Sequence, residues 1–326
     1  MKIVFLQTLN EHWKKRFDEL INEFPEVEFI NSAEPEKRIE LLKSADGVMS
    51  YRLDENDLAV AENLKAVFVP FTGLNTFPLE ELKRKNIFIS NTHANSPYVA
   101  EHALTLALSL LGRVVEMHHN LKEGKWRMSI QENDMWMTLR NKTCSIIGLG
   151  HIGTNLAQLL KSFDCKDIGF KRTQMKTIPE CVDEITLDVK EAIEKGEVIF
   201  VCLPLYEHTK GIITKEILMS MKGKFLINIG RGETVDEEGL YLSLKNGILE
   251  GAAIDAWYQY PTKKNPEPVF PSKFPFHELP NIVLSPHKSS HTTEAINAMI
   301  DDTVENIRSF LKTGQPKQFV GKDEIY

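Results

Sequence analysis

The chain has 326 residues, of which 42% are hydrophobic and 26% charged, as is typical of a folded protein with about two domains. Its formal net charge of −7 argues against nucleic acid as a partner, and no apolar run approaches the length of a membrane span. The four cysteines lack metal-ligand spacing and the first apolar run is too short for a signal sequence, so we expect a cytoplasmic protein with free thiols and no bound metal.

Residues 1–97 alternate between short apolar runs and polar stretches that favour helices. This alternation predicts a small α/β layer with its own parallel sheet. The segment has no glycine signature for phosphate, so we interpret it as the partner domain of a nucleotide-binding fold. An amphipathic stretch at 291–312 is expected to pack back on this domain. The strands are predicted at Ile3–Leu6, Val27–Ile30, Gly47–Met49, Ala66–Val69 and Ile87–Ile89.

The stretch from Tyr98 to Gly112 has a helical pattern and is apolar on most of its sides. A helix of this kind is buried, either within the fold or at an interface between subunits. Of these two alternatives we favour the interface.

The segment from Lys142 to Thr173 carries the clearest functional pattern. An apolar run, Cys144–Ile147, leads directly into Gly148, Gly150 and Gly153, and a helical pattern and a second strand follow. In this context the glycines permit a tight turn, approach of the backbone to a pyrophosphate and close packing of the helix. The N–H groups and the dipole at the start of the helix favour phosphate. The segment therefore predicts dinucleotide binding.

The end of the second strand, Ile168–Phe170, indicates which dinucleotide is bound. An NAD site commonly has an Asp or Glu here, which bonds the ribose 2′-hydroxyl. This chain instead has Lys171, Arg172 and Thr173. Two cations and a hydroxyl can hold a 2′-phosphate through charge-assisted hydrogen bonds, although a solvated basic loop is the alternative. We predict NADP in preference to NAD.

Three residues lie just beyond later strand ends: Arg231, Asp255 and His287. Ligands of open parallel sheets bind at the carboxyl ends of the strands, so we expect these residues in one crevice. Arginine can hold a carboxylate bidentately, and histidine titrates near working pH and is suited to passing a proton. The strands are predicted at Val198–Cys202, Phe225–Ile229, Gly251–Ile254 and Ile282–Leu284.

With these motifs in order, the chain resembles the D-isomer-specific 2-hydroxyacid dehydrogenases along nearly its whole length. The resemblance implies that Arg231 binds the substrate carboxylate and carbonyl, that His287 passes the proton, and that Asp255 contacts the nicotinamide amide. It also implies a homodimer with the helix after Val99-Ala-Glu101 at its interface. The motifs that carry it are Gly148-Leu-Gly-His-Ile-Gly153, Val201-Cys-Leu-Pro-Leu205 with Thr209, Asn228-Ile-Gly-Arg-Gly232, Asn246 to Asp255, and Ser285-Pro-His287.

The same resemblance assigns further contacts. The substrate carboxylate is expected on backbone N–H groups of the loop that contains Thr72, Gly73 and Leu74. The residues expected at the cofactor, besides Asp255 and the three at the end of the second strand, are Gly148, Gly150, His151, Ile152, Gly153, Leu203, Pro204, Thr209, Ile229 and Gly230.

One position departs from the family pattern. Members usually have a Glu before the Pro of an Asp-x-x-x-x-Glu-Pro run, paired with the catalytic His, and this chain has Tyr260 there. A neutral phenol can orient the ring by hydrogen bonding but supplies little charge. A shift in register that places Gln259 beside His287, as in the formate dehydrogenase branch, is an alternative, and a packing role for Tyr258 and Tyr260 is another.

We therefore expect an α/β protein of two doubly wound domains. A Rossmann dinucleotide-binding domain, 98–287, is inserted in a flavodoxin-like substrate domain, 1–97 plus 288–326. The predicted function is hydride transfer between NAD(P)H and a small 2-keto or 2-hydroxy acid, such as glyoxylate or hydroxypyruvate. The alternatives are a formate dehydrogenase-like enzyme and a non-catalytic sensor of the dinucleotide, like the co-repressor relatives of the family.

Overall fold

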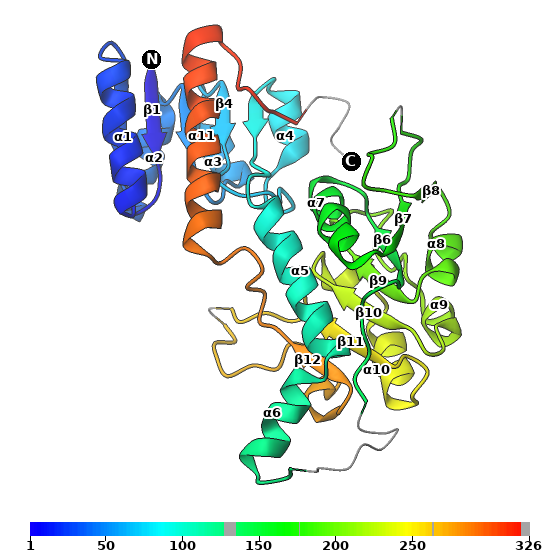
Figure 1. Cartoon of the computed structure of the whole chain (residues 1–326). Helices are drawn as coiled ribbons and strands as arrows, with labels where there is room; N and C mark the ends of the chain where they lie inside the picture. The colour runs from blue at the N-terminus through cyan, green and yellow to red at the C-terminus, as the bar shows by residue number, and fades with distance from the viewer. Residues whose placement is uncertain (127–134, 176, 263, 321–326) are drawn as a thin grey trace. The chain divides into compact units, whose positions relative to one another are not determined.

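The computed structural model describes residues 1–126, 135–175, 177–262 and 264–320. The chain divides into two compact units, one formed by Met1–Asn95 with His291–Tyr326 and the other by Ser96–Ser290 (Figure 1). Each unit is built around its own parallel sheet. The two units are described separately below.

The first unit contains a five-stranded sheet in the order β2-β1-β3-β4-β5, all parallel. This order is that of the flavodoxin-like doubly wound fold, as expected. The predicted strands are all present, with ends shifted by one residue at most positions. Their bounds are β1 Lys2–Phe5, β2 Glu28–Asn31, β3 Gly47–Met49, β4 Ala66–Phe68 and β5 Phe88–Ser90.

Alternation of side chains along β1 explains why helices cover both faces of this sheet. Ile3 and Phe5 pack on one face with apolar residues of α1 and α11, whereas Val4 packs on the other with residues of α2, α3 and α4. Helix α11 thus packs on the first unit, as its apolar face predicts. The helices are α1 Glu11–Glu23, η1 Pro35–Lys37, α2 Arg38–Ser44, α3 Glu55–Val60, α4 Leu79–Arg84 and α11 Thr293–Thr313.

The second unit contains a seven-stranded parallel sheet in the order β12-β11-β10-β9-β6-β7-β8. The chain leaves β6 in one direction to β7 and β8 and returns to its other side at β9, which is the Rossmann arrangement. The edge strand β8 was not predicted, because its three residues, Glu-Ile-Thr, form no apolar run. The bounds are β6 Thr143–Ile147, β7 Lys166–Phe170, β8 Glu184–Thr186, β9 Val198–Val201, β10 Phe225–Asn228, β11 Gly251–Ile254 and β12 Ile282–Leu284.

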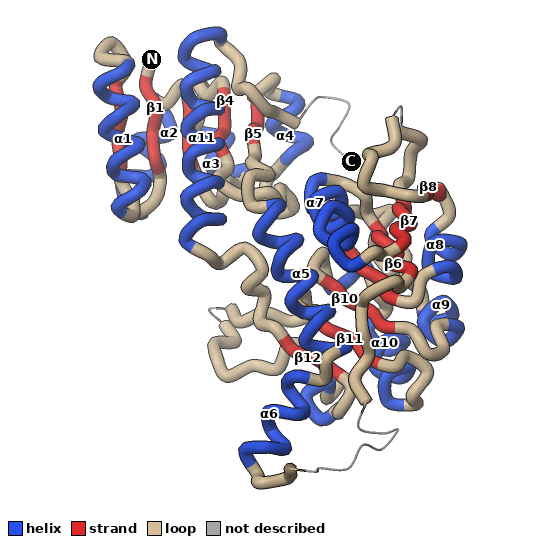
Figure 2. Tube along the Cα trace, in the orientation of Figure 1, coloured by secondary structure: helices blue, strands red, loops and turns tan. Residues whose placement is uncertain are grey.

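Helices cover both faces of this second sheet, α5 and α7 on one side and α8, α9 and α10 on the other (Figure 2). The strands are buried on both faces and therefore read as continuous apolar runs. The helices are α5 Ser96–Leu111, α6 Val114–Lys122, α7 His151–Leu160, η3 Lys161–Phe163, α8 Val189–Lys195, α9 Lys215–Ser220, η4 Gly232–Thr234, α10 Glu237–Lys245 and η5 Phe276–Glu278.

Helix α5 is the apolar helix expected between residues 98 and 112. Much of its apolar surface is buried inside its own unit, where it packs on α7 and on strands β10 to β12. Burial within the fold therefore explains why most of the residues of α5 are apolar. In the described residues no single helix is long and apolar enough to cross a membrane. Helices α5 and α6 meet the required length and apolar character only when they are counted together, across a bend of 55°.

One buried charge stands out beneath α7. The Asp167 side chain on β7 is fully buried, and neither carboxylate oxygen has a hydrogen-bond partner among the described residues. The Lys161 Nζ atom lies 3.7 Å from Asp167 Oδ2 but 2.7 Å from Asp183 Oδ2, so it forms the closer ion pair with Asp183. Burial raises the pKa of Asp167 to about 7, against the smaller opposing effect of Lys161.

This raised pKa predicts a pH-dependent loss of stability. The unfolded chain releases the Asp167 proton near pH 4 whereas the folded chain holds it to about 7, so stability falls as pH rises through this window. We expect D167N to be more stable than the wild type at pH 8 by roughly 1–3 kcal/mol, and the gain to shrink toward pH 4. Denaturant unfolding at several pH values measures both quantities.

Asp183 provides the matched control, because its hydrogen bonds from Lys161 and the Asp167 N–H outweigh burial and lower its pKa. D183N is therefore expected to lose stability at pH 8. A D167N protein that is no more stable than the wild type at pH 8 would contradict the prediction.

Candidate functional site

The turn between β6 and α7 has the geometry that its glycines predict. Gly148 has a φ of +108°, and a Cβ on Gly153 would lie 2.5 Å from the carbonyl oxygen of Gly148. The first glycine is thus needed for the turn and the third for contact between helix and strand. A Cβ on Gly150 would meet no atom within 4 Å, so the backbone at this position faces open space.

This open space lies at the start of α7, whose first residues are His151 and Ile152. The N–H groups of the first helical turn have no intrahelical partner and attract an anion. A Cβ at Gly150 would enter the space that a pyrophosphate needs in order to approach the backbone. The turn therefore fits a dinucleotide, and Gly148, Gly150, His151, Ile152 and Gly153 lie together as predicted.

Lys171, Arg172 and Thr173 follow the end of β7. Lys171 N donates a hydrogen bond to the Thr186 carbonyl, 3.2 Å away, which holds the start of this loop against β8. The Arg172 Nη1 atom lies 2.9 Å from Nε2 of His208, a contact that sequence reasoning missed. No signal pointed to His208, because it lies 36 residues further along the chain, in the loop after β9, and β6 separates β9 from β7 in the sheet.

The loops after β9 and β10 are packed closely against one another. Thr209 Oγ1 donates to the Pro204 carbonyl at 2.7 Å and accepts from Tyr206 N at 2.8 Å, which fixes the loop after β9. A Cβ on Gly230 would lie 2.5 Å from the Leu203 carbonyl oxygen. Leu203, Pro204, Thr209, Ile229 and Gly230 thus share one edge of the sheet, beside the glycine turn.

Arg231 follows Gly230 and is half-buried. Its Nη1 atom donates to the Gly230 carbonyl at 2.7 Å, and its own carbonyl accepts from the Asn228 side chain and from Thr234 Oγ1. The backbone on both sides of the guanidinium is therefore fixed. A fixed cation at a strand end is suited to holding a carboxylate.

Asp255 follows β11 and is fully buried. Its carboxylate accepts hydrogen bonds from Ser285 Oγ, from Lys288 N at 2.8 Å and from Ser289 N at 3.1 Å. Burial acts to raise the pKa of Asp255, but these hydrogen bonds outweigh it and lower the pKa below the ordinary value. The carboxylate is ionised and holds the chain that follows β12.

The residue between these anchored positions is His287, whose backbone has a φ of +56°. A left-handed conformation is uncommon for a residue with a Cβ and persists where the surroundings enforce it. Here the hydrogen bonds of Asp255 to Ser285, Lys288 and Ser289 enforce it from both sides. The contact of Asp255 with the nicotinamide stays a prediction. In the structure its hydrogen bonds position His287.

The hydroxyl of Tyr260 lies 2.9 Å from Nδ1 of His287 and accepts from Trp257 N at 3.0 Å. Burial raises the pKa of the Tyr260 phenol, so it is neutral at physiological pH. Of the alternatives left by the sequence, the structure therefore supports a direct contact between Tyr260 and the histidine. Tyr258 instead packs inward and donates to the Val235 carbonyl at 3.0 Å.

Arg231 also belongs to this group of residues. A Cβ on Gly232, the next residue, would lie 2.3 Å from the Trp257 carbonyl oxygen, so the loop that carries Arg231 contacts the loop that carries Tyr260. Arg231, Asp255, Tyr260 and His287 therefore converge at the carboxyl edge of β10 to β12, as strand ends predict.

The sequence reading missed His102 and named Ser285 without assigning it a role. His102 on α5 has its Nε2 atom 3.2 Å from Ser285 Oγ. Because the single Ser285 hydroxyl proton is donated to Asp255, Ser285 Oγ accepts the hydrogen from His102, which fixes the proton on Nε2. Ser285 stood in the Ser-Pro-His motif, whereas His102 is hidden in an otherwise apolar helix.

The predicted substrate residues Thr72, Gly73 and Leu74 lie in the first unit. Thr72 Oγ1 is 2.9 Å from the Thr92 carbonyl and 3.0 Å from Asn95 Oδ1, and Asn91 Nδ2 donates to the Thr72 carbonyl at 2.7 Å. The loop after β4 is thereby tied to the segment after β5. Its role toward substrate stays a prediction.

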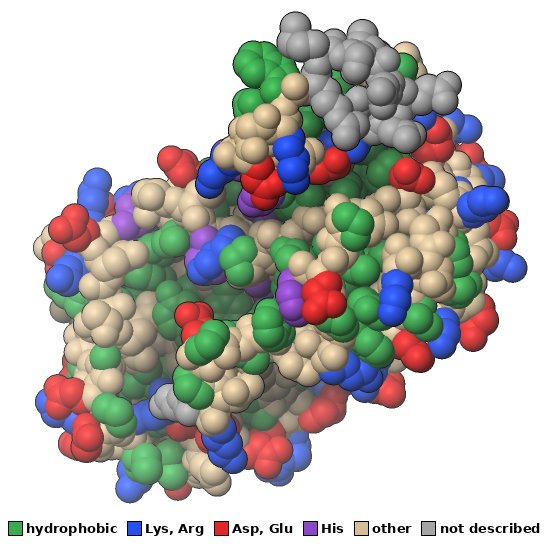
Figure 3. All heavy atoms as spheres, turned by 90° about the horizontal axis from the view of Figure 1, so that it is seen from below, with side chains coloured by type: hydrophobic (Ala, Val, Ile, Leu, Met, Phe, Trp, Pro, Cys, Tyr) green, Lys and Arg blue, Asp and Glu red, His purple; other side chains and the backbone are tan. Residues whose placement is uncertain are grey.

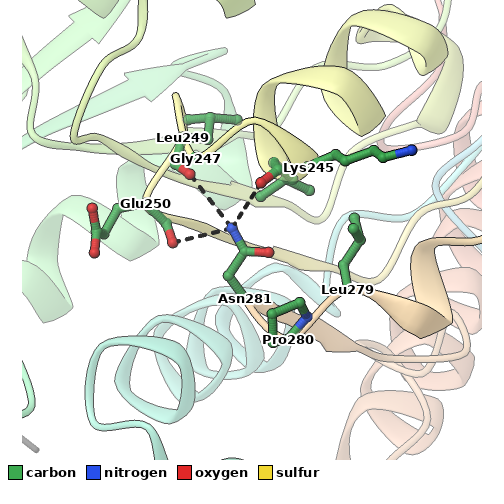
Figure 4. Close-up of a pocket in the computed structure, with 8 residues that line it drawn as sticks. Lys245, Gly247, Leu249, Glu250, Leu279, Pro280 and Asn281 are labelled. Carbon is green, nitrogen blue, oxygen red and sulfur yellow. Dashed lines mark hydrogen bonds between the residues drawn. The ribbon is translucent and has the colours of Figure 1, made fainter. Parts of the chain in front are cut away.

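A pocket of about 330 Å³ lies away from this chemistry. Glu250 and Asn281, which line it, directly precede β11 and β12, so it opens at the opposite edge of the sheet (Figure 4). The Asn281 side-chain amide donates to carbonyls of Leu244, Leu249 and Glu250 and joins the loop after α10 to the start of β12. We interpret this pocket as structural.

The surface charges of the molecule are mixed in sign. Figure 3 shows cationic and acidic side chains intermixed over the face in view. In the described residues no group of three or more His, Cys, Asp or Glu side chains is arranged to hold a metal ion, and all four cysteines are free.

Comparison with known proteins shows which family the chain belongs to. A family model described as D-isomer specific 2-hydroxyacid dehydrogenase, NAD binding domain, matches residues 104–289. Glyoxylate reductase of Thermofilum pendens is 31% identical over 89% of this chain and 86% of its own length. Glyoxylate/hydroxypyruvate reductase A HPR2 of Arabidopsis thaliana is 32% identical over 84% and 86% of the two chains.

The fold agrees as well. The crystal structure of an NADPH-dependent glyoxylate/hydroxypyruvate reductase from Sinorhizobium meliloti, with citrate, matches with a TM-score of 0.79 at 23% identity and covers 100% of this chain and 99% of that one. Family model, relatives and fold agree with the paired sheets and the glycine turn described above. The chain therefore belongs to the D-isomer specific 2-hydroxyacid dehydrogenase family and is an NAD(P)-dependent oxidoreductase.

Proposed function

We propose that this enzyme reduces a small 2-keto acid, such as glyoxylate or hydroxypyruvate, with NADPH in preference to NADH. The observation that carries the proposal is the convergence of Arg231 and the Tyr260–His287 pair at the strand ends of the dinucleotide-binding unit. The names of the relatives support the substrate class. Since the chain is an oxidoreductase, a non-catalytic sensor is not retained, and a keto acid is preferred to formate because the relatives are glyoxylate and hydroxypyruvate reductases.

Each residue of the site has its own role in the reduction. The nicotinamide, when bound, supplies the hydride. Arg231 holds the substrate carboxylate and polarises the adjacent carbonyl. Protonated His287 gives its Nε2 proton to the carbonyl oxygen, while its Nδ1–H donates to the Tyr260 hydroxyl. A phenol oxygen has two lone pairs, so it can accept from the histidine and from Trp257 N together.

Turnover tests the proposal directly. Cofactor oxidation followed by absorbance, across a panel of 2-keto acids with NADPH and NADH in parallel, should show reduction with NADPH preferred. H287N should lower kcat by roughly 10²- to 10⁴-fold, because the general acid is lost. R231K should chiefly raise KM, by about 10- to 100-fold, because an ammonium cannot bind a carboxylate bidentately.

Binding of NADPH, measured by fluorescence, should be nearly unchanged in both variants and controls for misfolding. Turnover by H287N at the wild-type rate would refute the role of the histidine. Failure of the wild type to reduce any 2-keto acid would refute the proposed substrate class.

The phenol at Tyr260 predicts a distinctive pH profile. A carboxylate beside an imidazole favours the charged ring, so Y260E should raise the pKa of His287. The acid form then persists to higher pH, and the falling limb of keto-acid reduction should move up by about one pH unit or more. Y260Q keeps a hydrogen-bond acceptor without charge and should leave that limb in place. Equal profiles for Y260E and Y260Q would show that charge at this position is without effect.

We further propose that the enzyme is a homodimer in which a second copy covers α6 and the residues near it. Isolated exposed apolar side chains need no explanation, but these gather along one helix and its flanks. Light scattering should give a dimer mass, and L121E should yield monomers; a wild-type monomer would exclude the proposal. The exposed residues are Val114, Val115, Met117, Leu121, Trp126, Met135, Trp136 and Met137.

A further inference from the structure

The contact between Arg172 and His208 joins two loops at the dinucleotide edge of the sheet. Arg172 comes from the end of β7, where an adenosine ribose is bound in this fold, and His208 from the loop after β9. The imidazole of His208 lies 5.7 Å from the Tyr206 ring, centroid to centroid, at an interplanar angle of 20°, so the phenol ring supports it from behind. Both side chains are exposed and accessible to a ligand.

The protonation state of His208 follows from this contact. Arginine has only donors, and its Nη1 atom lies 2.9 Å from Nε2 and 3.4 Å from Nδ1 of His208, so the nearer nitrogen, Nε2, presents a lone pair and the ring is neutral. Partial burial and the nearby charge of Arg172 both lower the pKa of His208. A guanidinium thus occupies the position where an anion would be bound by two cations.

We propose that His208 is the second half of the 2′-phosphate site, and that binding of NADP(H) is coupled to the uptake of one proton from solvent at its Nε2 atom. The phosphate then lies between two cations, the Arg172 guanidinium and the His208 imidazolium. NAD(H) lacks the phosphate and takes up no proton at this site. The inference rests on the proposed preference for NADP. It adds that His208, once protonated, contributes to this preference.

The other charges around His208 are compatible with this coupling. Glu207 and Lys210 flank it on its own loop and oppose one another in sign, and Lys171 lies beside Arg172 on the facing loop. Arg172 is the charge that acts on His208 in the free protein. A phosphate dianion placed between the two residues would replace this repulsion by attraction and raise the pKa of the imidazole.

The coupling fixes the sign of the pH effect. Because the bound state holds one more proton, affinity for NADPH falls as pH rises from 6.5 to 8.5, whereas affinity for NADH changes little. A shift of one unit in the pKa of His208 gives about a tenfold change in the ratio of the two affinities. Below about pH 6 the phosphate itself becomes protonated, so the measurement stays above that value.

The test measures binding, without turnover. Calorimetric titration of the full-length wild type with NADPH, NADH, 2′,5′-ADP and 5′-AMP, in buffers of different ionisation enthalpy, counts the protons taken up by each. For a shift of one unit we expect NADPH and 2′,5′-ADP to take up roughly half a proton at the pH midway between the free and bound pKa values of His208, and NADH and 5′-AMP close to none. H208Q, which can form hydrogen bonds but cannot be protonated, should abolish the uptake and weaken NADPH about tenfold while leaving NADH unchanged.

The controls separate this inference from the proposed function. H277Q, at an exposed position of η5 in the same unit, should behave as the wild type. If R172A weakens 2′,5′-ADP but H208Q neither weakens it nor removes proton uptake, the role of His208 is overturned and the NADP preference stands. If 2′,5′-ADP binds the wild type no more tightly than 5′-AMP, both are overturned, whereas the substrate class, tested by turnover, is unaffected.

Discussion

The buried carboxylate of Asp255 is the constraint on which the geometry of the site depends. It accepts hydrogen bonds from Ser285, Lys288 and Ser289, which lie on both sides of the Pro286–His287 pair. These bonds span the turn after β12. They hold His287 in its left-handed backbone conformation. Because Ser285 also accepts from His102, the anchor extends to α5, the long helix packed under the same strands.

The structure shows why sequence reasoning located most of this site. Residues that directly follow parallel strands must emerge at one edge of the sheet, so Arg231, Asp255 and His287 could be assigned from the strands alone. The glycine turn was readable for a similar reason: Gly153 tolerates no Cβ, and such a local constraint leaves a mark in the sequence. Both doubly wound sheets could likewise be predicted, since their strands form short apolar runs.

What the sequence could not reveal depends on contacts between distant segments. His208 meets Arg172 only because β9 and β7 flank β6 in the sheet, and no pattern in either loop reports that meeting. His102 was concealed in an apolar helix, and β8 by its polar composition. The neutral phenol at Tyr260 was visible as a departure from the family pattern, but its pairing with the histidine required the geometry of the loop after β11.

The close contact of Gly230 with Leu203 has a consequence for how such an enzyme can change. The loops after β9 and β10 meet there through backbone atoms, with no room for a Cβ, so neither loop can be displaced without the other. The loops after β9 and β10 are therefore expected to move together. Arg172 and His208, by contrast, are exposed side chains. Under our proposal that these two residues hold the 2′-phosphate, surface substitutions can exchange the preferred cofactor during evolution or engineering without altering the packed loops that carry the reacting residues.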